Sequence, residues 1–198
     1  MKLVLGTKNP GKLRELFQLA NNVDDLELEL APESFDPEET GATFSENALI
    51  KAREAARLTG VMSLGEDSGI EVDALGGKPG IYSARYCEGS DADRRVKLLQ
   101  DLSGVPVDQR GAAYFCAMAL VSPEGELLHN TSGRWPGQIG FNERGSNGFG
   151  YDPIFYLPDH KQTVAEISSE EKNKVSHRAQ AWLAMLEYLK HLNCVSHK

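Results

Sequence analysis

The sequence predicts an α/β fold built on one mixed β-sheet. Short apolar segments alternate with segments of helical periodicity, a pattern typical of a sheet flanked by helices. One long apolar segment, residues 112–121, is followed by a turn and a second apolar segment, which indicates an antiparallel hairpin. The 198 residues contain no internal repeat and no linker-like change of composition. We therefore expect a single α/β domain over residues 1–198.

The N-terminal part alternates strands and helices. Residues 3–6 form a short apolar segment that ends in glycine, which predicts a buried strand and a turn. Apolar residues then recur at helical spacing to about residue 21, and a second strand is expected over residues 26–30. The acidic, proline-containing segment 31–41 is typical of a loop.

A capping box marks the next helix. Thr43 and Glu46 have the required spacing, so a helix is expected over residues 44–58. The apolar segment 61–64 follows and predicts another buried strand. Residues 76–80 (GGKPG) are expected to form a loop that is rich in turns.

The C-terminal half contains two more helix starts. Ser90 and Asp93 predict one, and Ser168 and Glu171 predict the other. A single helix is expected from the second start towards the C-terminus. Between the two starts, the long apolar strand is expected to pair with a return strand over residues 127–135.

The charge balance excludes several classes of partner. The chain has 21 lysine and arginine residues against 29 aspartate and glutamate residues, a formal net charge of −8. Because an acidic surface repels a phosphate backbone, a nucleic-acid polymer is not an expected partner. The apolar stretches are far too short to cross a bilayer, so no membrane partner is expected. A small polyanion can still bind where basic side chains converge or where a metal ion bridges the charge.

The cysteines give no framework for a disulfide-linked or zinc-binding protein. Cys87, Cys116 and Cys194 lie far apart, and no CxxC motif occurs. No basic region, apolar region and cleavage site follow Met1, so no secretion signal is expected. These features favour a reduced chain located in the cytoplasm.

The first candidate site is the segment 6–12 (GTKNPGK), between the first strand and the first helix. Free amide groups at a helix N-terminus, glycines and a lysine together suit a phosphate group. The spacing matches the P-loop, but Leu13 stands where that motif needs a hydroxyl group to hold magnesium, so a standard ATPase is not favoured. The alternative is an ordinary strand–turn–helix with a solvated Lys12.

The second candidate is the segment 65–69 (GEDSG), directly after the predicted strand 61–64. Ligands usually bind at the carboxyl ends of strands, and Glu66 and Asp67 there are suited to hold a cation such as Mg²⁺ or to act as a general base. The alternative is a plain turn. Ser68 is not a nucleophile-elbow serine, because the order is not GxSxG.

A third group surrounds the start of the second predicted helix. Asn47 and Lys51 are four residues apart and therefore share a helix face. Together with Glu38, Glu39 and Glu46, they suit the flank of a metal–phosphate site. The alternative is an ordinary solvated face.

The remaining candidates lie towards the C-terminus. In the segment 148–153 (GFGYDP), Phe149 offers a stacking face and Asp152 can accept hydrogen bonds from ring nitrogens. The alternative is a turn with a packed aromatic ring. Further on, Lys172 and Ser176 are expected to share a helix face, close to a neighbouring pair of donors. These donors are His177 and Arg178, which can both donate to a carbonyl oxygen. The alternative is that His177 has a purely structural role.

Six segments occur together in an order that resembles the inosine triphosphate pyrophosphatase family, also called the HAM1-like proteins. They are residues 7–12, 39–48, 66–69, 76–86, 148–155 and 171–178. Each segment alone is a weak motif, but six in order cover nearly the whole chain. The resemblance implies an elongated mixed sheet flanked by helices, two lobes with a central active-site cleft, and a homodimer. It also implies Mg²⁺-dependent hydrolysis of ITP, dITP and XTP to the monophosphate and pyrophosphate.

The resemblance also assigns roles to residues. Asp67, Lys12 and Lys51 are expected to be catalytic, and Asp67 is expected to hold the metal with a glutamate, for which we prefer Glu39 to Glu38 or Glu66. The expected substrate-binding residues are Thr7, Lys8, Asn9, Pro10, Gly11, Lys12, Ser68, Phe149, Gly150, Tyr151, Asp152, Lys172, His177 and Arg178.

Two positions depart from the family pattern. Glu66 stands where an aspartate is usual, which keeps the charge but reaches further. Lys8 stands where a small residue is usual, and its side chain either contacts a phosphate or points to solvent. Neither departure removes Asp67 or Lys12.

These roles imply a mechanism in which two distant segments meet around one polyphosphate. We expect Asp67 and Lys12 to lie together, with water attacking the α-phosphorus and cations stabilising the leaving pyrophosphate. Donors from His177 and Arg178 would pair with the 6-keto group of hypoxanthine or xanthine and leave the amine of adenine unpaired. Guanine also carries a 6-keto group, and the sequence does not show what rejects it.

Three other functions stay open at this point. One is a related pyrophosphatase that acts on other modified nucleotides, for example modified pyrimidines. A second is a P-loop-like enzyme that releases orthophosphate, and a third is a nucleotide sensor without catalytic activity. Product analysis and Mg²⁺-dependent turnover separate these alternatives.

Overall fold

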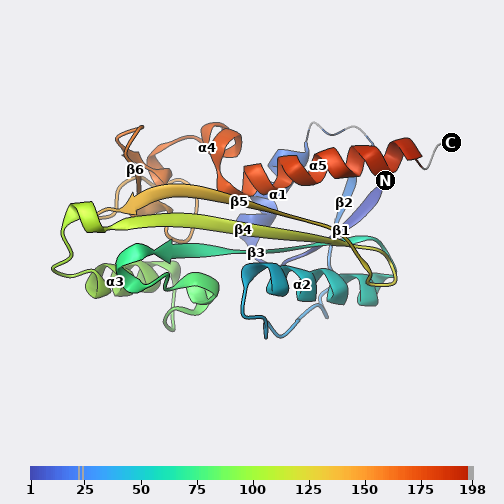
Figure 1. Cartoon of the computed structure of the whole chain (residues 1–198), viewed down its shortest axis with the longest axis horizontal. Coiled ribbons are helices and arrows are strands. Elements are labelled where there is room, and N and C mark those ends of the chain that lie inside the picture. Colours follow the sequence, from blue (N-terminus) through green and yellow to red (C-terminus); the bar gives the residue numbers. More distant parts are fainter. Residues whose placement is uncertain (22, 24, 196–198) are drawn as a thin grey trace. The chain divides into compact units, whose positions relative to one another are not determined.

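The central sheet is mixed, as the sequence predicts. In this computed structural model, which describes residues 1–21, 23 and 25–195, seven strands are hydrogen-bonded in the order β2-β1-β3-β4-β5-β6-β7 (Figure 1). The strands are β1 (Lys2–Gly6), β2 (Glu27–Leu30), β3 (Ser63–Val72), β4 (Gly111–Val121), β5 (Leu127–Ile139), β6 (Phe155–Leu157) and β7 (Gln162–Thr163). β1 runs parallel to β2 and β3, whereas β6 is antiparallel to β5 and β7.

α-Helices lie between and after these strands along the chain. They are α1 (Pro10–Ala20), α2 (Phe44–Thr59), α3 (Asp91–Asp101), α4 (Ser169–Val175) and α5 (His177–Val195). Short 3₁₀ helices lie in the connections: η1 (Asp73–Leu75), η2 (Gly80–Arg85), η3 (Val107–Gln109), η4 (Asp152–Ile154) and η5 (Val164–Glu166). In the part of the chain that the structure describes, no helix is long and apolar enough to cross a membrane.

The chain divides into two compact units. Unit 1 comprises Met1–Asp67, Cys116–Gly133 and His177–Lys198, and unit 2 comprises Ser68–Phe115 and Arg134–Ser176. The strands β3, β4 and β5 each contribute residues to both units.

Unit 1 is built on the alternation of side chains along β1. Leu3 and Leu5 join a core with residues of α1 and α5, while Val4 packs with Phe35 and Ala55. Because successive side chains of a strand point to opposite faces, β1 is covered on both sides. Figure 1 shows α1 and α5 on one face of this part of the sheet and α2 on the other.

The helix α2 begins and ends as predicted. Thr43 and Glu46 form a capping box with both hydrogen bonds present, and Gly60 ends the helix in the left-handed conformation at φ 65°. The helix lies so close to β3 that a Cβ on Gly65 would come within 1.9 Å of the Ala48 carbonyl oxygen. Glycine at position 65 is therefore a requirement of packing.

Unit 2 has a separate core with several aromatic rings. The rings of Tyr114 and Phe155 stack with their centroids 4.4 Å apart, and Trp135 packs against the same phenylalanine. Leu98 and Leu102 of the α3 segment are fully buried in this core. Ile139, the last residue of β5, belongs to the same core, so the core anchors the end of this strand.

The structure corrects three sequence-based expectations about elements. The strand expected over 61–64 continues to Val72, and the return strand expected to end at residue 135 continues to Ile139. β6 and β7 are too short to give a pattern in the sequence. The single C-terminal helix is divided at Ser176, whose ψ of 158° is extended, because serine favours the position that precedes a helix.

We predict that Gly65→Ala destabilises the protein by about 1–3 kcal/mol or more, because the added methyl group must displace the backbone of α2. Urea unfolding measures the change. Gly140→Ala is the matched control, since its Cβ would lie 3.6 Å from the nearest atom, the Ile154 carbonyl oxygen, and we expect a change within about 0.5 kcal/mol. Equal stability of the two variants would contradict the packing described for β3 and α2.

Candidate active site

The candidate carboxylates lie within β3, not after it. The sequence predicts Glu66, Asp67 and Ser68 at the carboxyl end of a strand, but they occupy the middle of β3. The expectation was wrong because a glycine after an apolar segment is typical of a turn, whereas Gly65 lies within the strand and lets α2 approach it. The alternative of a plain turn is excluded as well.

Asp67 is held by side chains from two helices of unit 1. Its Oδ1 lies 2.8 Å from the Nζ of Lys51 and 3.9 Å from the Nζ of Lys12. Its Oδ2 accepts a hydrogen bond of 3.3 Å from the Nδ2 of Asn47. The Asp67 side chain is only 7% exposed, so these contacts replace most of its water. The expected meeting of Asp67 and Lys12 is confirmed, as is the shared helix face of Asn47 and Lys51.

Lys51 joins a second carboxylate to this group. Its Nζ lies 2.5 Å from the Oε1 of Glu39, so Glu39 and Asp67 share one ammonium group. Asn47 fixes the loop that carries Glu39, because its Oδ1 accepts a hydrogen bond of 2.8 Å from the amide of Gly41. Glu38 is exposed and Glu39 is half-buried, and the preference for Glu39 as a metal ligand stays a prediction.

Glu66 belongs to a neighbouring chain of buried ion pairs. Its Oε2 lies 3.0 Å from the Nζ of Lys12, and its Oε1 lies 3.0 Å from the Nη2 of Arg178. The other end of that guanidinium group contacts Glu15, and the thiol of Cys116 donates to Glu66 at 3.3 Å. Sequence reasoning missed Glu15, although its position three residues after Lys12 on α1 puts both on one face.

Burial shapes the acid–base properties of these groups. Burial raises the pKa of the Asp67 carboxyl above its usual value, and the attraction of Lys12 and Lys51 offsets this only in part. Burial alone would lower the pKa of Lys51, but its contacts with Asp67 and Glu39 outweigh burial and raise it. Burial also raises the pKa of the Cys116 thiol well above its usual value, so this cysteine stays protonated at neutral pH.

The N-terminus of α1 is capped by the side chain of Asn9, the residue before the helix. Asn9 Oδ1 accepts hydrogen bonds from the amides of Gly11 and Lys12, at 2.9 and 3.1 Å. The expectation of free amides at these two positions was therefore wrong, because asparagine before a helix satisfies them. The amide of Asn9 donates to Thr7 Oγ1 at 3.3 Å, and Pro10 occupies the first helical turn.

Lys8 does not join this cluster of charges. Its side chain is exposed, and its Nζ donates a hydrogen bond of 2.7 Å to the carbonyl oxygen of Glu33. Ser68 is half-buried on β3. The structure thus brings together Lys12, Lys51, Asp67 and Glu39 among the predicted residues of unit 1.

The glycine-rich segment of unit 2 forms a second polar cluster around Asp152, which is 2% exposed. Asp152 Oδ2 accepts hydrogen bonds from the amide of Phe149 at 2.9 Å and from the Nζ of Lys172 at 2.6 Å, and Oδ1 accepts from the hydroxyl of Tyr114 at 3.0 Å. The Lys172 ammonium group also lies 5.1 Å from the centroid of the Phe149 ring. Tyr151 is buried and donates to a backbone carbonyl within the unit. Tyr114 was not predicted, because nothing in the strand sequence marks it.

His177 and Arg178 are separated from Lys172 by the end of α4. They begin α5 and belong to unit 1, whereas Lys172 belongs to unit 2. The expectation that Lys172 and Ser176 share a helix face was wrong, since Ser176 is extended. The role of Arg178 as a donor to a purine ketone stays a prediction. The structure shows that Arg178 forms ion pairs with Glu15 and Glu66.

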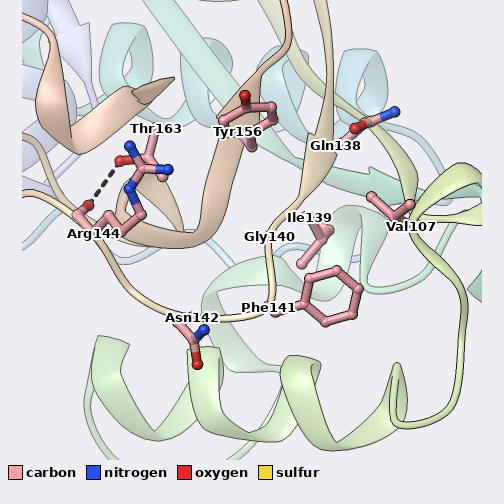
Figure 2. Close-up of a pocket in the computed structure, with 9 residues that line it drawn as sticks. All are labelled: Val107, Gln138, Ile139, Gly140, Phe141, Asn142, Arg144, Tyr156 and Thr163. Atoms are coloured by element: carbon pink, nitrogen blue, oxygen red, sulfur yellow. Dashed lines mark hydrogen bonds between the residues drawn. The ribbon is translucent and has the colours of Figure 1, made fainter. Parts of the chain in front are cut away.

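A pocket of about 370 Å³ lies elsewhere in unit 2. Figure 2 shows Gln138, Phe141, Asn142 and Tyr156 around it, together with a hydrogen bond from the Thr163 hydroxyl to a backbone carbonyl. None of the predicted site residues lines this pocket, so it carries none of the expected chemistry.

The comparison with protein families decides the family. A model described as the Ham1 family matches residues 3–188. The chain belongs to the Ham1 family. This confirms the family expected from the six motifs.

Individual Ham1 relatives cover nearly the whole chain. A protein of Yersinia pseudotuberculosis named dITP/XTP pyrophosphatase is 47% identical, with 96% of this chain and 98% of the relative covered. A dITP/XTP pyrophosphatase of Symbiobacterium thermophilum is 49% identical, with 95% of this chain and 94% of the relative covered. The structure of a HAM1 protein from Coxiella burnetii is 40% identical with a TM-score of 0.85, and 96% and 99% of the two chains are covered. These likenesses agree with the observed α/β fold.

The donor set of this Ham1 protein fits the magnesium ion that the resemblance implies. Among the described residues, no group of three or more histidine, cysteine, aspartate or glutamate side chains is arranged to hold a metal ion. Mg²⁺, however, is usually bound by one or two carboxylates and completed by water and substrate phosphates. Glu39 and Asp67, which contact the same ammonium group, are such a pair.

We predict that Arg178→Leu destabilises the protein by about 3–5 kcal/mol, because it removes the buried guanidinium group that Glu15 and Glu66 both contact. Urea unfolding measures the loss. Adding Glu66→Gln to this variant removes one of the two buried carboxylates that lose the guanidinium group, and should restore part of the stability.

The exposed arginine Arg57, which pairs with Glu54, provides the control. Arg57→Leu should change the unfolding free energy by no more than about 1 kcal/mol, as for other exposed ion pairs. If Arg178→Leu is no more destabilising than this control, the buried ion-pair chain does not stabilise the fold.

Proposed function

We propose that this protein hydrolyses ITP, dITP and XTP to the nucleoside monophosphate and pyrophosphate, and so removes these non-standard nucleotides from the pool. The observation that carries the proposal is the buried Asp67 carboxylate with two ammonium groups within 3.9 Å and Glu39 beside it. The relatives named dITP/XTP pyrophosphatase support the choice of substrates.

In this proposal the cations of unit 1 bind the triphosphate. Lys12 and Lys51 present ammonium groups that phosphate oxygens can contact in exchange for carboxylate oxygens. The segment 7–12 adds the positive end of α1. The exposed Lys8 is the least buried of the three lysines and contributes the least in this arrangement.

Asp67 and Glu39 would hold Mg²⁺. When bound, the ion neutralises negative charge on the phosphates. Asp67 would also take a proton from a water molecule as that water attacks the α-phosphorus. The bond to the bridging oxygen then breaks, pyrophosphate leaves with the electron pair, and Lys12 and Lys51 stabilise its charge.

For unit 2 we propose recognition of the purine base. The half-buried Phe149 ring would stack on the base, and Lys172, whose ammonium group lies 5.1 Å from the ring centroid, is held by Asp152. His177 and Arg178, which belong to unit 1, remain the proposed donors to the 6-keto oxygen. Because adenine has an amine at that position, a site built for a ketone would leave buried donors unpaired with ATP.

We predict that Asp67→Asn lowers kcat for ITP by a factor on the order of 10² or more, since an amide cannot accept the proton of the attacking water. Steady-state kinetics at saturating Mg²⁺ measures the loss, and urea unfolding verifies that the variant is folded. Near-normal turnover of a folded Asp67→Asn variant would refute its role as the base.

A nucleotide panel tests the substrate class. ITP, XTP and dITP should be hydrolysed well ahead of ATP, GTP and CTP, with pyrophosphate and the monophosphate as products and with no turnover when Mg²⁺ is removed. Faster hydrolysis of modified pyrimidine nucleotides would favour the related pyrophosphatase instead. Release of orthophosphate with IDP, or binding without turnover, would contradict the proposed reaction.

Three further expectations are part of the proposal. The chain is expected to act as one domain over residues 1–198, to form a homodimer and to work in the cytoplasm, where the nucleotide pool is found. Sedimentation equilibrium tests the homodimer, and a mass of one chain at micromolar concentration would rule it out.

A further inference from the structure

The residue that follows Phe149 is held on both sides by one helix. The amide of Gly150 donates to Asp91 Oδ2 at 2.9 Å, and the carbonyl oxygen of Gly150 accepts from Arg95 Nη1 at 2.9 Å. Asp91 and Arg95 are four residues apart on α3 and therefore share a face. We call these two residues the α3 clamp.

The clamp completes the anchoring of the Phe149 backbone. The amide of Phe149 donates to Asp152, and the next amide along the chain, that of Gly150, donates to Asp91. The flanking glycines Gly148 and Gly150 adopt φ values of 75° and 60°, which other residues rarely adopt. Glycine restricts the backbone less than other residues do. The hydrogen bonds to Asp152, Asp91 and Arg95 therefore hold this loop in one conformation.

Arg95 is itself rigidly oriented. Its Nε and Nη2 bind the two oxygens of Glu143 at 2.8 and 3.1 Å, a bidentate pair that fixes the plane of the guanidinium group. The third nitrogen, Nη1, is then directed at Gly150. The Arg95 side chain is 13% exposed, so little water competes for this contact.

Asp91 is held in its ionised form. Burial alone would raise the pKa of Asp91, but the contacts with Arg94 and the amide of Gly150 outweigh burial and lower it. The side chain therefore stays an acceptor at neutral pH. Its Oδ1 binds Arg94 at 2.9 Å, which leaves Oδ2 for Gly150.

We propose that Asp91 and Arg95 are positioning residues that set the Phe149 ring for the base of the nucleotide. The inference rests on the proposed function, in which Phe149 stacks on the purine. An ordered ring loses less conformational entropy when the base binds, so the clamp contributes to binding of the base. The clamp touches neither Asp67 nor the lysines of unit 1 in the contacts described above, so it affects KM and leaves kcat nearly unchanged.

The test compares Arg95→Met with wild type on ITP. We expect KM to rise about tenfold, as for loss of hydrogen bonds to a charged group, with kcat within about twofold. Inorganic tripolyphosphate, which has no base, serves as a competitive inhibitor, and its inhibition constant should be unchanged. Arg95→Lys keeps the charge and should give an intermediate KM.

Arg53→Met is the matched control, because Arg53 also donates to a glycine carbonyl in a loop, that of Gly125 at 3.1 Å, but lies in unit 1. Its KM for ITP should equal that of wild type. Asp91→Ala removes the other half of the clamp and should repeat the Arg95→Met result, which covers the case in which that variant is poorly folded.

The outcomes separate the inference from the function on which it rests. An unchanged KM in both clamp variants, or an equal loss of affinity for ITP and tripolyphosphate, would overturn the clamp while the proposed function stands. Failure of the wild-type protein to hydrolyse ITP would overturn both. A rise in KM for ITP alone supports the clamp.

Discussion

The ion pair between Lys51 and Asp67 is the interaction on which the rest of the site depends. A buried carboxylate is unfavourable unless it is paired, and Asp67 obtains its closest cation from α2. The same ammonium group holds Glu39, and Asn47 one turn earlier on α2 holds both Asp67 and the Glu39 loop. One helix therefore sets the position of the central carboxylate and of its neighbour.

The wider cluster has more negative than positive groups. In the described part of unit 1, three cationic side chains meet four carboxylates: Lys12, Lys51 and Arg178 against Glu15, Glu39, Glu66 and Asp67. A surplus of carboxylate suits a divalent cation, and the lysines suit the phosphates that arrive with it. In the proposed reaction the lysines would therefore exchange carboxylate partners for phosphate oxygens when substrate binds.

The close fit of α2 against β3 makes this arrangement possible. Because residue 65 has no side chain, the backbone of α2 lies against β3. Lys51 and Asn47 of α2 can therefore reach Asp67, two residues further along the strand. In unit 2, α3 instead holds the loop at Gly150 through hydrogen bonds to its backbone. In both units a helix fixes a functional segment that the sequence alone leaves free.

Much of this could be predicted from the sequence where the causes are local. The capping box at Thr43 and the spacing of Asn47 and Lys51 gave the helix and its polar face correctly. The place of Asp67 within its strand could not be predicted, because Gly65 has the same appearance in a turn as in a close contact. The ion pairs of Arg178 join residues 163 and 112 positions apart, and only the folded chain reveals such partners.

In the proposed function, Lys51 binds the phosphates of the substrate in addition to its ion pair with Asp67. Calorimetric titration with a non-hydrolysable ITP analogue in the presence of Mg²⁺ tests this directly, with Lys51→Met compared with wild type and with the exposed-site variant Arg57→Met. We expect Lys51→Met to bind at least about tenfold more weakly and Arg57→Met to bind as wild type does. Equal affinity of all three proteins would contradict the role of Lys51 in holding the triphosphate.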